Sequence, residues 1–150
     1  MMAKQSLIFV DTEDANATPT GWTLREFGAV DYDTRAWFHG EDCSRKTFVE
    51  FKQWLDRLAP GRKTFISDNP AYDWAPIEWW FRYHLNENPF GWSARRIGDF
   101  YAGLVGDFRK SSEWKSLRIT KHDHNPVHDA MGNVEAFERM LKGERGKQRK

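Results

Sequence analysis

The sequence predicts an α/β protein in which helices flank a mixed β-sheet that contains an antiparallel meander. The apolar run at 7–10 is short, continuous and rich in β-forming residues, which is typical of a strand buried on both faces. Two further β-like segments, at 22–31 and 35–39, follow closely, as the strands of a meander do. Helical periodicity and one more β-like segment, at 63–67, make up most of the remaining chain. The resulting order, β-β-β-α-β-α-α-α, favours a sheet with helical crossovers.

The composition fits one domain without a membrane span. The 150 residues carry a formal net charge of +1, which excludes a long polybasic tail protein and an acidic, solvating chain. Aromatic residues make up 15% of the chain, enough large rings to fill a core. The single cysteine, Cys43, excludes an intramolecular disulfide and a multi-cysteine zinc site. We expect one domain over 1–142 and a basic, flexible tail over 143–150.

The sequence predicts neither a signal peptide nor a membrane span. The apolar run near the N-terminus is too short for a signal peptide, and no window approaches the ~20 apolar residues of a membrane span. We therefore expect a cytoplasmic protein that makes no contact with a membrane. With a net charge near zero, any binding of nucleic acid would have to be local or carried by bound metal cations.

The first helix is predicted from a capping box and an apolar stripe, and the second from a proline at its start. Residues 15–21, ANATPTG, have turn chemistry and separate the first strand from the meander. The first helix is predicted to begin at a T-x-x-E capping box formed by Thr47 and Glu50. The next helix is expected to open near Pro76 and to run to about Leu85. The apolar stripe of the first helix comprises Phe48, Phe51, Trp54, Leu55 and Leu58.

The last two helices have the strongest periodicity. The earlier stripe comprises Ile97, Phe100, Tyr101, Leu104, Val105 and Phe108. The final helix has Asn125 as an apt N-cap, Pro126 at its first position and Gly143 as its stop. Its stripe comprises Val127, Ala130, Met131, Val134, Phe137 and Leu141.

Acidic side chains follow the first strand directly. If strand geometry persists through Glu13, the side chains of Asp11 and Glu13 point to the same side. The two carboxylates would then converge at an end of the sheet, where ligand sites of α/β proteins tend to lie. Ordinary polar loop residues are the alternative, and the adjacent Asp14 leaves the register open.

Further acids and a histidine stand at two other structural boundaries. In Asn69-Pro-Ala-Tyr-Asp73, the carboxylate of Asp73 can reach the same sheet end, with helix capping as the alternative and Asp68 as a competitor. In HNPVHDA at 124–130, His124 precedes the helix and Asp129 lies one turn in, away from the apolar stripe. That position suits an active site and equally suits exposure to solvent.

Together these segments resemble the DEDD-type 3′–5′ exonucleases. The pattern is D-x-E at 11–13, N-x-x-x-D at 69–73 and H-x-x-x-x-D-A at 124–130, which is similar to the branch with histidine in the third motif, the DnaQ-like or DEDDh group. REFGAV at 25–30 resembles the strand that follows the first motif. The resemblance covers about residues 6–142, and the chain is most similar to the stand-alone bacterial and phage exoribonucleases. It implies an RNase H-like fold.

The resemblance also implies a mechanism and its residues. Phosphodiesters would be hydrolysed from the 3′ end with two divalent cations, Mg²⁺ or Mn²⁺, to release nucleoside 5′-monophosphates. His124 would deprotonate the attacking water. The cations would balance four carboxylates that otherwise repel one another, and hard cations of this kind prefer carboxylate oxygen. The implied metal ligands are Asp11, Glu13, Asp73 and Asp129.

The implied substrate is the 3′ end of single-stranded RNA or DNA, with RNA favoured. Contacts to it are expected from Thr12, Glu13 and Asn69. Trp22 is a candidate for stacking on a base, with packing in the sheet as the alternative. A DNA exonuclease of the same family and a catalytically inactive nucleic-acid-binding module on the same fold are the alternatives.

A homodimer is a further expectation, because members of this family are often homodimers. The three consecutive rings at 79–81 cannot all point inward from one helix. One of them is therefore expected to meet another element or a second subunit.

Overall fold

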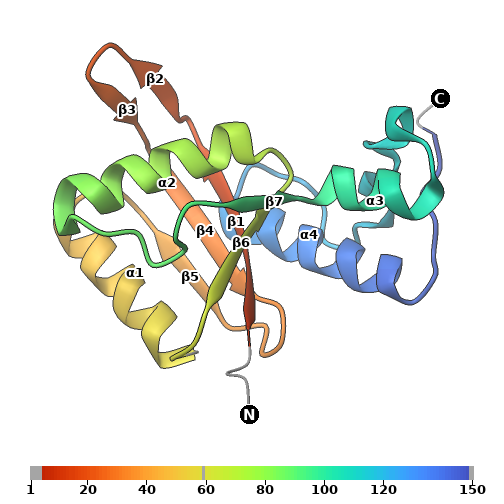
Figure 1. Ribbon diagram of the computed structural model, residues 1–150, viewed down its shortest axis with the longest axis horizontal. Helices are drawn as coiled ribbons and strands as arrows, with labels where there is room; N and C mark the ends of the chain where they lie inside the picture. Colours follow the sequence, from red (N-terminus) through yellow and green to blue (C-terminus); the bar gives the residue numbers. More distant parts are fainter. Residues whose placement is uncertain (1–4, 59, 149–150) are drawn as a thin grey trace.

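The computed structural model describes residues 5–58 and 60–148 and has the predicted α/β architecture. Its main sheet has five strands in the order β5-β4-β1-β6-β7 (Figure 1). The meander β1-β4-β5 is antiparallel, and β6 and β7 continue the sheet in parallel from β1. This mixed sheet confirms the predicted class and is consistent with an RNase H-like fold. The strands are β1 (Ser6–Glu13), β4 (Glu26–Asp31), β5 (Trp37–Gly40), β6 (Lys63–Ser67) and β7 (Ala94–Arg96).

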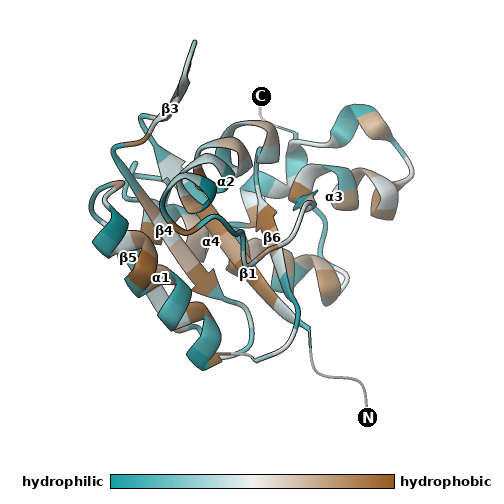
Figure 2. Ribbon diagram, turned by 60° about the vertical axis from the view of Figure 1, so that its left-hand side comes forward, coloured by the Kyte–Doolittle hydropathy of each residue, from teal (hydrophilic) through white to brown (hydrophobic). Residues whose placement is uncertain are grey.

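Helices cover both faces of the sheet, as predicted (Figure 1). Successive side chains of β1 point to opposite faces, and Ile8 and Val10 pack with the helices α1 (Arg45–Leu58) and α2 (Pro70–Leu85). Phe9 packs on the other face with α4 (Pro126–Leu141). In Figure 2 the strands β1 and β6 carry hydrophobic colour, which agrees with a strand buried on both faces.

The segment predicted as one strand over 22–31 is divided in the structure. Residues Asn16–Thr18 (β2) and Gly21–Thr23 (β3) form a separate hairpin, which projects beyond the main sheet (Figure 1). A Cβ atom on Gly21 would lie 2.2 Å from the ring of Trp79, so the missing side chain lets the hairpin rest on α2. Packing of the hairpin on α2 separates β3 from β4, which local β-propensity does not reveal.

The first helix begins earlier than predicted. It starts at Arg45, and the hydroxyl of Ser44 accepts a hydrogen bond from the backbone N–H of Thr47. The Thr47 hydroxyl donates in turn to the carboxylate of Asp42. Thr47 therefore lies inside the first turn, and the predicted capping box with Glu50 is wrong, because Ser44 already stands at the cap.

The second helix also begins earlier, at Pro70 rather than near Pro76. A proline fits the first position of a helix, where its missing N–H has no partner to lose, and both prolines satisfy that rule in the sequence. Pro76 lies inside the helix and is buried. Asp73 consequently belongs to the first turn of α2 instead of preceding the helix. Of the three rings at 79–81, Phe81 is buried and Trp79 meets the hairpin.

The third helix is shorter than its periodicity predicts. α3 (Ile97–Val105) ends at Gly106, whose φ of 70° is the left-handed geometry that favours glycine. Two short 3₁₀ helices follow, η1 (Phe108–Lys110) and η2 (Glu113–Leu117), and Trp114 of η2 is fully buried. Phe108, predicted to lie in the helical stripe, is exposed instead.

The final helix has the predicted start. The side-chain oxygen of Asn125 accepts hydrogen bonds from the N–H groups of Val127 and His128, and Pro126 occupies the first position. Beyond it, the N–H of Gly146 donates to the hydroxyl of Tyr101, and the N–H of Lys147 donates to the hydroxyl of Ser116.

The predicted boundaries of the domain and the tail extend beyond the described residues. Residues 1–4 and 149–150 lie outside them. One domain over 1–142 and flexibility of the segment 143–150 stay predictions. Within the described ranges, none of the helices is long and apolar enough to cross a lipid bilayer.

Candidate active site

Three predicted acids converge at the carboxyl end of β1. Pairing with β4 continues to Glu13, so the condition for Asp11 and Glu13 to share a face is met. That face is the one covered by α4, which presents Asp129 in its first turn. One carboxylate oxygen from each of Asp11, Glu13 and Asp129 lies within 4.8 Å of the others. The structure thus brings together residues more than 110 positions apart in the sequence.

A glycine in β4 permits this approach. Gly28 lies opposite Asp11 in the β1–β4 pairing. A Cβ atom at Gly28 would lie 2.4 Å from the carbonyl carbon of Pro126, which is backbone in the first turn of α4. The helix can therefore rest directly on the sheet at this point. Its close contact buries Asp129, which has an exposed fraction of 2% although it lies off the apolar stripe.

The fourth acid reaches the same strand from the opposite face. The backbone N–H and the hydroxyl of Thr12 both donate to Oδ1 of Asp73, at 3.1 and 2.7 Å. Asp73 is buried in the first turn of α2, and its own N–H donates to the carbonyl of Asn69. Asp73 is therefore held against β1 by Thr12, and its charge acts on Asp11, but it is not a member of the group formed by Asp11, Glu13 and Asp129.

The remaining predicted residues near the site have other neighbours. Asn69 precedes α2 without a capping hydrogen bond from its side chain. Trp22 of β3 is half-buried and packs against the core on the α1–α2 face. Asp68, the competitor of Asp73, forms ion pairs with Lys115 at 2.7 Å and with Arg118 at 3.6 Å, and it is not part of the acid cluster.

Burial, together with the crowding of the carboxylates, favours their neutral forms in the absence of cations. Burial raises the pKa of Asp11 to about 10, and the charges of Asp73, Asp129 and Glu13 add to the effect. Burial also raises the pKa of Asp73 to about 6, although the hydrogen bonds from Thr12 oppose it. The pKa of Glu13 is raised in the same direction, again chiefly by burial. The cluster therefore opposes the accumulation of negative charge when no cation balances it.

Two of these carboxylate oxygens have no hydrogen-bond partner among the described residues. Oδ2 of Asp11 and Oδ2 of Asp129 are buried and accept no hydrogen bond. Buried polar atoms are nearly always satisfied in native proteins, and carboxylate oxygens are the preferred ligands of Mg²⁺ and Mn²⁺. A divalent cation would satisfy both atoms and offset the repulsion. The donor set therefore fits such a cation.

Two imidazoles flank the acids on the loop before α4. Nδ1 of His124 lies 3.8 Å from Oε2 of Glu13, and 75% of the His124 side chain is exposed. Nδ1 of His122 lies 2.9 Å from Oδ2 of Asp129, within ion-pair distance although the geometry is not that of a hydrogen bond. The two rings meet edge-on with centroids 4.5 Å apart. Sequence reasoning did not place His122 at the site, and the H-x-H spacing at 122–124 was the signal available.

The loop with the two imidazoles is attached to α4 at several points. The N–H of Asp123 donates to Oδ1 of Asp129, and the N–H of Thr120 donates to the carboxylate of Glu135. His124 itself has a φ of 61°, in the left-handed region that non-glycine residues adopt rarely. The backbone geometry thus turns the chain sharply where it passes the acids.

The chain is similar to the 3′–5′ DNA exonuclease Cap18 of Escherichia coli. The two are 30% identical over 96 residues, which cover 59% of this chain and 51% of that protein. The chain thus spans about half the length of the curated relative it matches. No protein-family model matches the chain.

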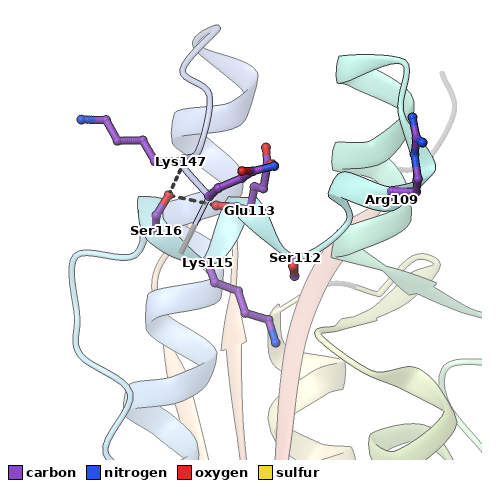
Figure 3. A pocket seen from close by; sticks show the side chains of 7 residues that line it. Arg109, Ser112, Glu113, Lys115, Ser116 and Lys147 are labelled. Carbon is purple, nitrogen blue, oxygen red and sulfur yellow. Dashed lines mark hydrogen bonds between the residues drawn. The ribbon is translucent and has the colours of Figure 1, made fainter. Parts of the chain in front are cut away.

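A separate cavity lies outside the acid cluster. Its volume is about 340 Å³, and it lies between η1, η2 and the C-terminal segment (Figure 3). None of the predicted catalytic residues lines it. Its lining comprises Arg109, Ser112, Glu113, Lys115, Ser116, Lys147 and Gln148.

Proposed function

We propose that this protein is a metal-dependent 3′–5′ exonuclease of the DEDDh type, which releases nucleoside 5′-monophosphates. The observation that carries the proposal is the convergence of Asp11, Glu13 and Asp129, in which the buried Oδ2 atoms of Asp11 and Asp129 accept no hydrogen bond. The similarity to a 3′–5′ DNA exonuclease supports the same activity. A nucleic-acid-binding module without catalysis would not need such a costly group of buried acids.

The proposed ligands act from both faces of the sheet. Asp11, Glu13 and Asp129 would hold Mg²⁺ or Mn²⁺, and Asp73 would complete the set from α2. Two such cations, when bound, stabilise the attacking and leaving oxygens of an in-line displacement. Thr12 positions Asp73 through its two hydrogen bonds. With a net charge of only +1 on the chain, much of the affinity for a polyanion would depend on the cations.

His124 is the proposed general base. An imidazole accepts a proton efficiently near neutral pH. The ring lies beside Glu13 and is largely exposed, so it can reach a water molecule placed at the acids. Glu13 would in addition contact the 3′-terminal hydroxyl of the strand. A proton taken from the attacking water would leave through His124 to the surrounding solvent.

The substrate can be either RNA or DNA, and a different observation favours each. The resemblance to stand-alone exoribonucleases favours RNA, whereas the relative from Escherichia coli is a DNA exonuclease. We propose that the substrate is the 3′ end of single-stranded RNA. The 3′ end of single-stranded DNA is the second candidate, because the relative acts on DNA. Base stacking by Trp22, contacts from Asn69 and a homodimeric assembly stay predictions.

The decisive experiment uses matched RNA and DNA oligomers that are labelled at either the 3′ or the 5′ end. The protein is incubated with each oligomer in Mg²⁺, in Mn²⁺ and in chelator. We expect stepwise shortening from the 3′ end, early release of a 3′-terminal label and no reaction in chelator. Asp11→Asn should remove the activity, and Asp107→Asn, which changes a carboxylate outside the cluster, should keep it. The proposal would be refuted if neither RNA nor DNA were shortened in either metal, or if shortening began at the 5′ end.

A further inference from the structure

A second group of potential metal ligands overlaps the acid cluster. It consists of His122, His124 and Asp129, and one ligand atom from each lies within 4.8 Å of the others. Two of its three donors are imidazole nitrogens, whereas the donors of the cluster formed by Asp11, Glu13 and Asp129 are all oxygens. The two groups share Asp129, so a cation in one competes with a cation in the other.

We propose that His122, His124 and Asp129 form a Zn²⁺ site, and that zinc bound there inhibits the enzyme. Two imidazoles and one carboxylate, with the fourth position open to water, are a common tetrahedral environment for zinc. Mg²⁺ prefers six oxygen ligands and binds imidazole poorly. The nitrogen-containing group therefore selects zinc over the cations expected at the acids.

The carboxylate of Asp129 is oriented toward this group. Oδ1 accepts a hydrogen bond from the N–H of Asp123, which fixes the side chain. Oδ2 is buried without a hydrogen-bond partner and lies 2.9 Å from Nδ1 of His122. Ligands of a tetrahedral zinc ion lie roughly 3.3–3.5 Å apart, given zinc–ligand bonds near 2.0 Å. Because most of the His124 side chain is exposed, its ring can turn to complete the site.

Inhibition follows because the zinc site would use two residues of the proposed catalytic machinery, His124 and Asp129. Zinc on a ring nitrogen of His124 would occupy the electron pair that the imidazole needs to accept a proton. Zinc on Asp129 would also withdraw a carboxylate from the Mg²⁺ or Mn²⁺ site. The inhibition rests on the function proposed above, whereas the binding of zinc does not.

The binding of zinc is tested by calorimetry in millimolar Mg²⁺, which suppresses binding of zinc to Asp11 and Glu13. Because Mg²⁺ also competes for the shared Asp129, all variants are compared at the same Mg²⁺ concentration. We expect one Zn²⁺ per chain and an affinity that falls at least tenfold in His122→Ala. His128→Ala is the matched control, because His128 pairs with Asp123 outside this group, and it should bind zinc as the wild type does. Substitution of Zn²⁺ by Co²⁺ should give visible absorption typical of a four-coordinate site. Equal zinc affinity in His122→Ala and the wild type, or no saturable binding, would overturn the proposal.

The consequence for hydrolysis is measured separately, with each variant compared with its own rate in Mg²⁺ alone. We expect micromolar Zn²⁺ to slow the wild type and the His128→Ala variant at least tenfold. The His122→Ala variant should need at least ten times more zinc for the same inhibition. Zinc binding without hydrolysis under any condition would support the zinc site and refute the exonuclease function. Hydrolysis that zinc inhibits equally in both histidine variants would overturn the inhibitory site alone.

Discussion

Neutralising one buried acid should stabilise the protein when no metal is present. Asp73 is 4% exposed, and burial raises its pKa from 3.8 to about 6. A shift of that size corresponds to roughly 3 kcal/mol of unfavourable free energy for the ionised folded state. Asp73→Asn removes the charge and keeps the oxygen that accepts both hydrogen bonds from Thr12. After the cost of burying the new amide NH₂, we expect a net gain of about 1–2 kcal/mol.

The sign of the effect can be checked through its pH dependence. Because the folded pKa of Asp73 is raised, the folded state binds the proton more tightly than the unfolded state. Its contribution to stability is therefore fully present below pH 3.8 and is lost as the pH rises through about 6. In chelator, the wild type should lose stability between pH 4 and 6, and Asp73→Asn should lose less over the same range.

Urea denaturation in chelator at several pH values measures this difference. Asp107→Asn is the control of opposite sign, because hydrogen bonds from Arg109 lower the pKa of that exposed carboxylate. Saturating Mn²⁺ should reverse the order, since the wild type gains a ligand that the Asp73 variant lacks. A variant that is less stable than the wild type at pH 7 in chelator, with the same pH dependence, would show that the acids are not under electrostatic strain.

Three further predictions concern the geometry that assembles the site. His124→Ala should keep the fold and metal-induced stabilisation but lose ~10²–10⁴-fold in the rate of nucleotide release, and an unimpaired rate would remove His124 from the mechanism. Gly28→Ala should destabilise the protein by ~1–3 kcal/mol, because its Cβ atom would lie 2.4 Å from the backbone of α4. A melting temperature equal to that of the wild type would contradict this close approach. Asn125→Ala should cost about 1 kcal/mol in urea denaturation through loss of the cap on α4, whereas Asn125→Asp should retain most of the stability.

Local patterns were sufficient where one signal had no competitor. The run at Leu7–Val10 predicted a strand buried on both faces, and Asn125 followed by Pro126 predicted the start of the last helix. Local patterns failed where two positions carried equivalent signals. Pro70 and Pro76 both suit the first position of a helix, and only the structure shows that Pro70 begins α2. Propensity alone also joined β3 to β4, because it contains no information on the packing of Gly21 against Trp79.

For the candidate site as well, the sequence determined some features and the tertiary structure determined others. The sequence by itself determined which residue types stand after β1, in front of α2 and at the start of α4, because these depend on order and spacing along the chain. Only the tertiary structure decided that Asp129 is buried against Asp11 and Glu13, that Asp73 is held by Thr12 from the opposite face, and that His122 joins His124. The physical reason is that burial and electrostatic coupling depend on distances across the sheet. Those distances are set by contacts such as that of Gly28 with Pro126, which no local pattern encodes.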